Sequence, residues 1–413
     1  MERLLCLQIN YEEEKMMKRV VKKSLLMAGI LLAVSAGLVF AGGQKEGATK
    51  DEFVIGMAHS HTGWAAAFDV AFTCGFKYAA DEINSKGGIA GKYKIRLITG
   101  RDCASIAEEA VKSVDALLEQ GVDMLAIGCD SSGAIAAGRH GQERGVLMIT
   151  STGSQPMTTI RVGDWMYQSN FTDNLQGSAM AIYAREDLKV NTAFLLVSDD
   201  DAYTELPKYF AEIFEKKGGK IVGTATYNFE QVDFGSVVAQ IKRLPKEPDV
   251  IMTAAFEPDF PAFLRQIRAA GIKSKVLGAD ALDTPTVYAL GPVADGVILM
   301  TNRVPVSGSE YEKIMKGFGQ KYPEHVENAG SIVGYIAMYL MATAVEKADS
   351  TEPERVRAAL DSLENWPGPT GPYTYKGMNR QPIMPVHILE VSNGAGVYKK
   401  MVLPDKSDIA KPY

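Results

Sequence analysis

The amino-acid sequence predicts an α/β protein made of two lobes, each built on a doubly wound parallel sheet. Apolar, strand-like runs alternate with amphipathic helical stretches, which is the pattern of parallel strands covered by helices on both faces. The alternation occurs in two series, over residues 53–150 and 192–278. With 413 residues, the chain is also longer than a single hydrophobic core usually serves, so two lobes are expected.

The first series contains four expected strands and three expected helices. The strand pattern is clearest after residue 92, where apolar side chains alternate with Lys94 and Arg96 at a period of two. The strands are expected at 53–57, 95–99, 124–127 and 146–150. The helices are expected up to Asn84, over 105–120 and up to Arg144.

The second series repeats this order. Strands are expected at 192–197, 221–227, 250–253 and 276–278, with helices over 203–217 and 260–270. Asp233 is expected to cap a further helix. The apolar residues of that helix recur at helical spacing, and they are Phe234, Val237, Val238, Ile241 and Leu244.

The last third of the chain mixes helices with strands. A strand is expected at 297–300, then helices over 310–321 and 329–347. Another helix is expected to open at Thr351-Glu352-Pro353-Glu354, which has the form of a capping box. Strands are expected again at 371–375 and 383–391.

Residues 1–41 are expected to form an N-terminal extension and a signal peptide. A basic start at 18–23 precedes an apolar run over 25–40, and small residues at 41–43 suit a leader peptidase. The apolar run is shorter than the ~20 residues of a membrane span, although a retained membrane anchor is the alternative. Residues 42–52 are expected to be a flexible tether. The protein is therefore predicted to be exported by a cleavable signal peptide.

Composition and motifs argue against several other classes of protein. The net charge of −6 argues against nucleic acid, which needs a basic face. The sequence has no G-x-G-x-x-G after the first strand, no P-loop lysine motif and no G-x-S-x-G elbow. His59 and His61 are two potential ligands where a zinc site needs three or four, and the acidic run at 199–201 suits a solvated loop. We therefore expect no catalysis, no cofactor and no metal.

The segment Asp-Glu-Ile-Asn-Ser-Lys-Gly-Gly-Ile-Ala-Gly at 81–91 follows a strand and a helix. Gly87, Gly88 and Gly91 can take the positive φ that ends a helix and reverses the chain. In this motif the chain resembles the branched-chain amino-acid (Leu/Ile/Val) binding proteins of ABC importers, which are type I periplasmic binding proteins. The resemblance extends from about Phe53 to about Met401.

The resemblance implies a three-segment hinge between the lobes, with crossings near Asn170, Thr301 and Pro369. Lobe one would then comprise residues 53–170 and 302–368. Lobe two would comprise residues 171–301 and 369–403, followed by a C-terminal tail at 404–413.

Ligands of open parallel sheets bind outside the carboxyl ends of the strands, so the residues that follow the expected strands are candidates for a site. Lobe one offers hydroxyl and aromatic side chains there, and lobe two offers aromatic side chains and an acid. The candidates are Trp64, Phe68, Ser131, Ser132, Thr152, Gly153, Ser154, Tyr203, Phe256 and Asp280.

This set suits a zwitterion such as an amino acid. Ser131 and Ser132 are expected where a helix begins, and free backbone N–H groups there favour a carboxylate. Asp280 can accept a charge-assisted hydrogen bond from an ammonium group. Structural roles are the alternatives. The serines could cap a helix, Asp280 could be an N-cap or turn residue, and Trp64 and Phe68 could be core residues of the first helix.

The resemblance implies a role for individual candidates. Ser131 and Ser154 would hold the ligand carboxylate, a carbonyl near Thr152 and the acid Asp280 would hold the ammonium, and Tyr203 would close over the ligand. The chain departs from the common pattern with Asp at 280 instead of Glu and with Phe at 68 and 256 instead of Tyr. The ligand could therefore be a branched-chain, other apolar or aromatic amino acid. An amide, an aromatic acid or another small carboxylate is the alternative.

The resemblance also implies a disulfide and a partner. Cys103 and Cys129 each follow an expected strand end, and the family often links these two loops by a disulfide. Export would place the protein in an oxidising compartment that permits one. The expected partner is the membrane permease of an ABC importer, and the protein itself is expected to be a monomer. An enzyme and a receptor-coupled sensor are the less favoured functions.

Overall fold

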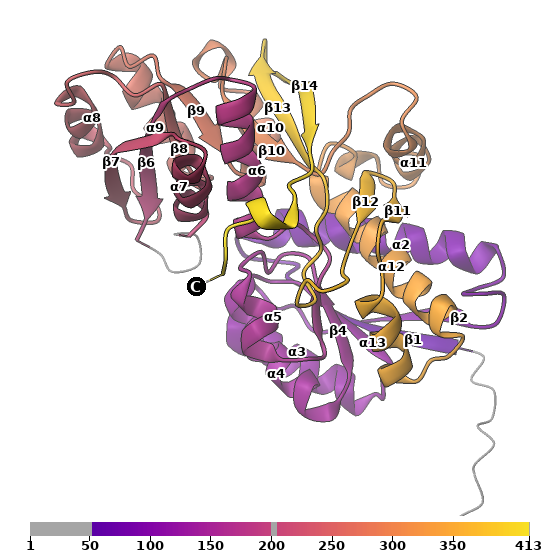
Figure 1. Cartoon of the computed structure of the whole chain (residues 1–413). Coiled ribbons are helices and arrows are strands. Elements are labelled where there is room, and N and C mark those ends of the chain that lie inside the picture. Colours follow the sequence, from indigo (N-terminus) through magenta and orange to yellow (C-terminus); the bar gives the residue numbers. More distant parts are fainter. Residues whose placement is uncertain (1–51, 200–204, 413) are drawn as a thin grey trace, which may run out of the picture. The chain divides into compact units, whose positions relative to one another are not determined.

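The computed structural model describes residues 52–199 and 205–412. Its two large sheets confirm the predicted α/β fold of two lobes (Figure 1). The expected signal peptide and most of the expected tether lie outside the described residues, as do Asp200, Asp201 and Tyr203.

Lobe one is built on five parallel strands in the order β2-β1-β3-β4-β5. The strands are β1 (Glu52–Ala58), β2 (Lys94–Thr99), β3 (Met124–Ile127), β4 (Leu147–Thr150) and β5 (Met166–Gln168). The helices between them are α2 (Ala66–Ser85), α3 (Ala107–Glu119), α4 (Ser131–Arg144) and α5 (Met157–Val162). The sequence did not predict β5 or α5, because 3 and 6 residues are too few for a period to show.

The side chains of β1 show that both faces of this sheet are covered. Phe53, Ile55 and Met57 belong to the hydrophobic cluster that includes α2. Val54 and Ala58 point to the opposite face and belong to the cluster that includes α3 and α4. A strand buried on both faces explains why its sequence is continuously apolar instead of alternating.

Lobe two has seven strands in the order β14-β13-β10-β9-β8-β6-β7. The parallel strands are β6 (Thr192–Ser198), β7 (Lys220–Tyr227), β8 (Val250–Thr253), β9 (Lys275–Gly278) and β10 (Ile298–Thr301). The antiparallel strands β13 (Val386–Ser392) and β14 (Ala395–Val402) extend the sheet beside β10. Its helices are α6 (Asp173–Glu186), α7 (Leu206–Lys216), α8 (Gly235–Lys242), α9 (Asp259–Ala269) and α10 (Pro285–Tyr288).

The remaining elements are α11 (Glu310–Phe318), α12 (Ala329–Ala348), α13 (Pro353–Asp361) and a small sheet of β11 (Trp366–Gly368) and β12 (Gly371–Tyr373). Of the described helices, α12 is long and apolar enough to span a membrane, but 83% of its most apolar window is buried. It packs against α2, as Figure 1 shows. It is therefore a core helix of this fold.

Two predicted helix caps are wrong. Helix α13 has Glu352 as its N-cap residue, without a side-chain cap bond. Pro353 takes the first helical position, which suits a residue without an N–H, so Thr351 lies outside the helix. In α8 the N-cap residue is Phe234, although the carboxylate of Asp233 accepts the Gly235 N–H at 2.8 Å.

The third predicted crossing also needs correction. Tyr375 donates its hydroxyl to the carbonyl of Gln168 in β5 at 2.7 Å, and the side chain of Gln381 donates to Thr159 in α5 at 2.9 Å. The chain therefore stays on lobe one through Gln381 and returns to lobe two just before β13, later than Pro369.

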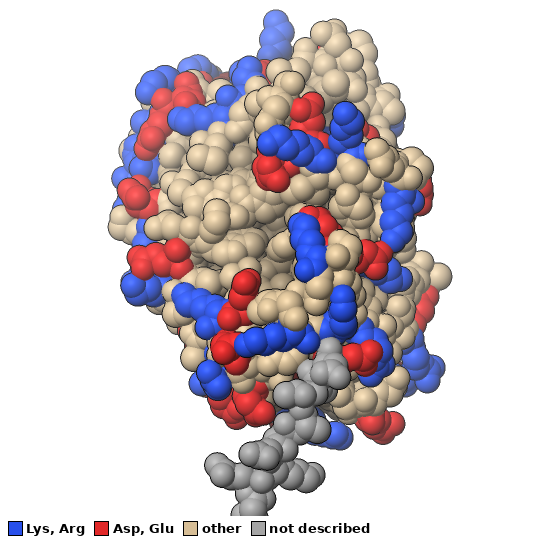
Figure 2. Space-filling model, turned by 90° about the vertical axis from the view of Figure 1, so that its right-hand side faces the viewer, with Lys and Arg blue, Asp and Glu red and all other residues tan. Residues whose placement is uncertain are grey.

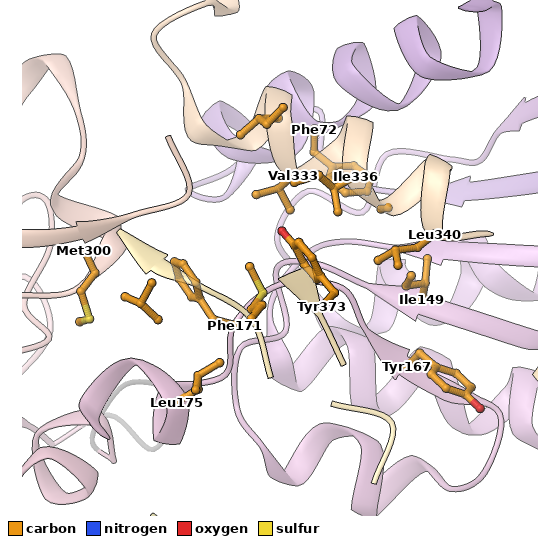
Figure 3. Packing of buried hydrophobic residues seen from close by; sticks show 14 of the residues in the cluster. Phe72, Ile149, Tyr167, Phe171, Leu175, Met300, Val333, Ile336, Leu340 and Tyr373 are labelled. Carbon is orange, nitrogen blue, oxygen red and sulfur yellow. The ribbon is translucent and has the colours of Figure 1, made fainter. Parts of the chain in front are cut away.

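One hydrophobic cluster runs through elements of both lobes. Figure 3 shows Phe72 of α2 beside Val333 and Ile336 of α12, and Phe171, Leu175 and Met300 continue the cluster toward lobe two. The tail is also fixed, because the side chain of Asn174 and the carbonyl of Ala410 are hydrogen-bonded at 2.9 Å. The surface in Figure 2 carries acidic and basic side chains intermixed on the face shown.

Candidate functional site

The candidate residues of lobe one lie on loops that leave neighbouring strands. At the carboxyl ends of these strands, Ala58 of β1 pairs with Ile127 of β3, and Ile127 pairs with Thr150 of β4. The loops after β1, β3 and β4 therefore start side by side. They carry Trp64 and Thr152 to Ser154, and the loop after β3 leads into Ser131 and Ser132 at the start of α4.

The start of α4 shows that Ser131 and Ser132 do not cap this helix. Asp130 is the N-cap residue, and its carboxylate accepts the Gly133 N–H at 2.5 Å. Ser131 is the first helical residue and is buried, and its hydroxyl accepts the Gln155 N–H at 3.1 Å. Ser132 is exposed. The two serines thus occupy the helix terminus where backbone N–H groups favour an anion.

The loop after β4 is held by short-range hydrogen bonds. The Gly153 N–H donates to the hydroxyl of Thr150 at 3.2 Å, and the Gly153 carbonyl accepts from the side chain of Gln168. A Cβ on Gly153 would lie 3.2 Å from that Thr150 hydroxyl oxygen, so the glycine permits a close approach. The Oγ1 atom of Thr152 is buried without a hydrogen-bond partner among the described residues.

Asp173, which was not among the candidates, joins this loop to lobe two. It is the first residue of α6 and only 6% exposed, and its N–H donates to the Ser154 carbonyl at 3.0 Å. The Ser154 hydroxyl donates to its carboxylate. Burial raises the pKa of Asp173 to about 7; the Ser154 hydrogen bond opposes this shift and the charge of Asp280 adds to it.

Asp280 faces the same turn of α6 from the loop after β9. Its N–H donates to Oε1 of Gln176 at 3.3 Å, and the Gln176 side chain also hydrogen-bonds its carboxylate. Burial raises the pKa of Asp280 to about 6. Asp280 opens a short 3-10 helix whose N-cap residue is Ala279, so Asp280 is not an N-cap. Asp173 and Asp280 thus form a pair of neighbouring carboxyl groups in a poorly solvated place.

The aromatic candidates separate into two groups. Trp64 and Phe256 come together across the two lobes, with ring centroids 6.1 Å apart. Phe68 is half-buried and packs against the hydrophobic cluster of α2 and α12, so it is at least partly a core residue. Tyr203 lies outside the described residues.

Phe229 is an aromatic residue that the sequence reasoning missed. Its ring lies 5.5 Å from that of Phe256, and 37% of the residue is exposed. It follows the carboxyl end of β7 by two positions. The rule that singled out the other candidates would have found it, had it been applied to the end of this edge strand.

The predicted disulfide is not formed in the structure. Cys103 and Cys129 are buried free thiols. They are nevertheless neighbours. A hydrogen bond between the two side chains, together with burial, favours the protonated thiol and raises the pKa of Cys129 well above its usual range. The loops that carry them meet as the resemblance implies, but as two thiols.

His59, one of the two histidines near the site, lies in the hydrophobic core. His59 is fully buried and stacks on Phe72 with a centroid distance of 4.7 Å. Burial, and then the nearby His61 and Lys77, lower the pKa of His59 to about 3. In residues 52–199 and 205–412, no group of three or more His, Cys, Asp and Glu is placed to hold a metal ion.

The arrangement therefore offers three kinds of contact on adjoining loops. The start of α4 and Ser154 can receive an anion. Asp173 and Asp280 can receive a cation, whose charge would relieve the repulsion between them. Trp64, Phe256 and Phe229 present aromatic faces to an apolar group.

Comparison with known proteins identifies relatives of this chain. The model of the periplasmic binding protein family matches residues 52–396. The Leu/Ile/Val/Thr/Ala-binding protein of Pseudomonas aeruginosa is 24% identical over 340 residues, which cover 81% of this chain and 89% of that protein. The Leu/Ile/Val-binding protein of Escherichia coli K12 is 25% identical, with coverage of 68% and 73%.

Solved structures agree in fold. A leucine-binding protein from Thermotoga maritima has a TM-score of 0.74 at 22% identity, covering 85% of this chain and 99% of that chain. A solute-binding protein from R. palustris in complex with benzoate has a TM-score of 0.71 at 20% identity, covering 86% and 97%. At these identities the likeness concerns the fold alone.

Proposed function

The chain belongs to the periplasmic binding protein family, and we propose that this protein is an exported solute-binding protein that delivers an amino acid to an ABC importer. The ligand would have a branched-chain, other apolar or aromatic side chain and would bind between the two lobes. Export would use the signal peptide expected within residues 1–41, and the protein would act in the periplasm as a monomer.

The observation that carries the proposal is the pair of carboxyl groups of Asp173 and Asp280. Among the described residues, neither side chain makes an ion pair; burial is the main cost of ionising each carboxyl group, and the charge of Asp280 adds to the cost for Asp173. An ammonium group can donate three hydrogen bonds. It also carries a positive charge, which neither carboxylate has as a partner among the described residues. Gln176 would keep Asp280 oriented toward it.

The other end of the amino acid would meet lobe one. Its carboxylate would take the backbone N–H groups at Ser131 and Ser132 and the Ser154 hydroxyl, which would turn its single O–H from Asp173 to the ligand. Thr152 and Gly153 would shape the loop. The apolar side chain would pack on Trp64 and Phe256, with Tyr203 as a covering residue. Phe68 would support this group from the core side.

Binding would proceed by hinge closure. A ligand that touches both lobes stabilises the closed arrangement, and only this differential contact can drive closure. Ser154 and Trp64 lie on lobe one and Asp280 and Phe256 on lobe two, so one ligand would meet both. The membrane permease would then recognise the closed form.

A small carboxylate such as an aromatic acid is the second candidate. The hydroxyl-free rings of Phe256 and Phe229 favour it, and structural neighbours from R. palustris are in complex with benzoate and 4-hydroxybenzoate. An acid without an amine would leave Asp173 and Asp280 unneutralised, so we rank it below an amino acid.

Thermal unfolding against a solute panel tests the proposal. The panel holds the amino acids, small amides, aromatic acids and sugars. A ligand at a hundredfold excess over its Kd stabilises the folded protein by about 2.7 kcal/mol. We expect an apolar or aromatic amino acid to raise the midpoint, and Asp280→Asn to weaken its binding by about a hundredfold.

The matched control is Asp295→Asn. Asp295 is an exposed acid of the same lobe that precedes β10 and accepts the Asn393 N–H at 2.9 Å. This variant should bind like the unchanged protein. A midpoint that responds only to acids without an amine, or to sugars, would overturn the amino-acid assignment.

A further inference from the structure

Asp69 of α2 is a buried acid to which no binding role has been given above. It is 0% exposed. One carboxylate oxygen, Oδ2, accepts the N–H of Ser60 at 2.8 Å and the N–H of Cys129 at 2.9 Å. A single side chain thus hydrogen-bonds two backbone groups that lie far apart in the sequence.

Both of these N–H groups belong to loops that carry candidate binding residues. Ser60 lies in the loop between β1 and α2, which carries Trp64. Cys129 lies in the loop between β3 and α4, directly before Asp130 and Ser131. Because the ends of β1 and β3 are paired, one carboxylate can hold both loops at their point of departure.

The bond network extends to a third loop. The Ser60 hydroxyl accepts the Ser105 N–H at 2.9 Å, and the Ser105 hydroxyl accepts the Ala65 N–H at 3.0 Å. Ser105 belongs to the loop after β2. Asp69 therefore fixes Ser60, Ser60 fixes the loop after β2, and that loop fixes the residue next to Trp64.

The backbone near Cys129 needs such support. Cys129 has a φ of 76°, which is uncommon for a residue other than glycine. A Cβ on the preceding Gly128 would lie 2.7 Å from Asp69 Oδ2 and 2.4 Å from His59 Cδ2. The backbone thus passes close to Asp69. The hydrogen bond from the Cys129 N–H to Asp69 helps to hold Cys129 in this otherwise unfavourable backbone conformation.

An ordinary helix-capping role does not account for these contacts. Asp69 lies in the first turn of α2, where an acid is favoured by the helix dipole. Its Oδ2 contacts are nevertheless to Ser60 and Cys129, which lie outside α2. The N-cap residue of α2, Ala65, has no side-chain cap bond.

We propose that Asp69 is a positioning residue for ligand binding, which ties the loops after β1 and β3 together so that Trp64 and the start of α4 face one ligand. This inference rests on the proposed function for its ligand, but the clamp itself can be tested without one.

A carboxylate at the other end of the same strands supplies the control. Asp123 precedes β3, and its Oδ2 accepts the Val54 N–H at 2.7 Å. Asp123→Ala therefore also removes a carboxylate that holds a backbone N–H group of β1, but away from the candidate residues. Asp69→Asn keeps an oxygen that can accept both N–H groups. The amide NH2 of Asn then takes the place of Asp69 Oδ1, an atom that has no hydrogen-bond partner among the described residues.

The first measurement is amide hydrogen exchange at Ser60 and Cys129 in the ligand-free protein. Both amides should be protected in the unchanged protein, in Asp69→Asn and in Asp123→Ala, and should exchange at least about tenfold faster in Asp69→Ala. Protection that survives in Asp69→Ala would overturn the clamp. If Asp69→Ala does not fold, Asp69→Ser replaces it, because its hydroxyl is too short to reach both groups.

The second measurement is the Kd for L-leucine and L-phenylalanine. We expect Asp69→Ala to weaken binding by at least about tenfold, and Asp69→Asn and Asp123→Ala to stay within about threefold of the unchanged protein. Equal effects of Asp69→Ala and Asp123→Ala would overturn the positioning role. If the unchanged protein binds neither probe nor any other amino acid of the panel, the proposed function fails, and hydrogen exchange alone decides the clamp.

Discussion

At the scale of single residues, the acids of this protein are used in contrasting ways. Asp283 is buried against Arg303, whose Nε donates to it at 2.7 Å. Asp173 and Asp280 instead have hydroxyl and amide neighbours, and burial raises the pKa of both. An acid with a permanent cation stabilises the fold, whereas an acid without one is suited to a ligand that brings the charge.

The raised pKa values predict opposite effects of pH on stability and on binding. Asp69, Asp173 and Asp280 have pKa values of about 7, 7 and 6 in the folded protein, against about 3.9 in an unfolded chain. The folded protein therefore holds protons that the unfolded chain has lost. This contribution to stability is fully present below about pH 4 and is lost as the pH rises through 6 to 7.

Ligand binding should change in the other direction. An ammonium group needs ionised carboxylates, so the Kd for an amino acid should tighten by about tenfold or more between pH 5 and pH 8. Titration calorimetry over this range, beside denaturation of the ligand-free protein, measures both slopes. A Kd independent of pH would contradict the assignment of Asp173 and Asp280 to the ammonium.

At the scale of elements, the contact between α2 and α12 depends on glycine. A Cβ on Gly334 of α12 would lie 2.1 Å from the Phe72 carbonyl oxygen, and one on Gly75 of α2 would lie 1.8 Å from the Ser331 carbonyl oxygen. These atoms belong to backbone, which cannot move aside as a side chain can. The two helices are therefore packed closely enough that any side chain at these positions would separate them.

Gly334→Ala should reduce the free energy of unfolding by about 1–3 kcal/mol through overpacking. Gly235→Ala is the control, because that glycine is exposed at the start of α8 and its nearest neighbour is a side-chain oxygen. The gain in helix propensity makes this substitution neutral or slightly stabilising. Urea denaturation of both variants decides the matter, and equal midpoints would contradict close packing of α2 on α12.

The sequence predicted most elements because their patterns are those of buried strands and amphipathic helices. The strand at 124–127 and that at 250–253 coincide with β3 and β8. Helix α6 was missed, because Asp173, Asn174 and Gln176 are polar yet buried and leave no apolar period. β14 was missed as an edge strand whose residues are mostly exposed.

The lack of a clear hydrophobic period in some elements also explains which residue was missed at the site. The rule of strand ends found Trp64, Ser131, Ser154, Phe256 and Asp280, because each follows a strand whose pattern is clear. Asp173 is the first residue of the unrecognised α6, a few positions after the short β5, so no rule pointed to it. The contact of Ser154 with Asp173 depends on tertiary structure and has no signature in the sequence.

At the scale of the whole molecule, Arg303 connects the lobes electrostatically. It follows β10 and is buried with Asp283 of lobe two, which also accepts the hydroxyls of Tyr288 and Thr301. Its Nη1 pairs with Glu327, whose side chain is 77% exposed and which precedes α12 on lobe one. Because the buried half of this network pairs Arg303 with Asp283, the exposed half can be broken without leaving Arg303 unpaired.

Glu327→Gln should therefore weaken ligand binding by about twofold to fivefold, since an exposed ion pair contributes at most about 1 kcal/mol. The effect should shrink at high ionic strength. Glu324→Gln, an exposed acid three positions earlier, is the control and should leave the Kd unchanged. If Glu327→Gln binds normally in low salt, the pair does not contribute to the arrangement of the lobes that binds ligand.

The contact of Trp64 with Phe256 has a practical consequence for studying this protein. The chain has three tryptophans. Trp165 lies under the guanidinium of Arg357 and Trp366 against Tyr373, both inside lobe one. Trp64 alone of the three meets a ring of the opposite lobe and is 48% exposed. Its indole emission therefore depends on how the lobes meet, so the protein carries an intrinsic fluorophore that would report the proposed hinge closure without any label.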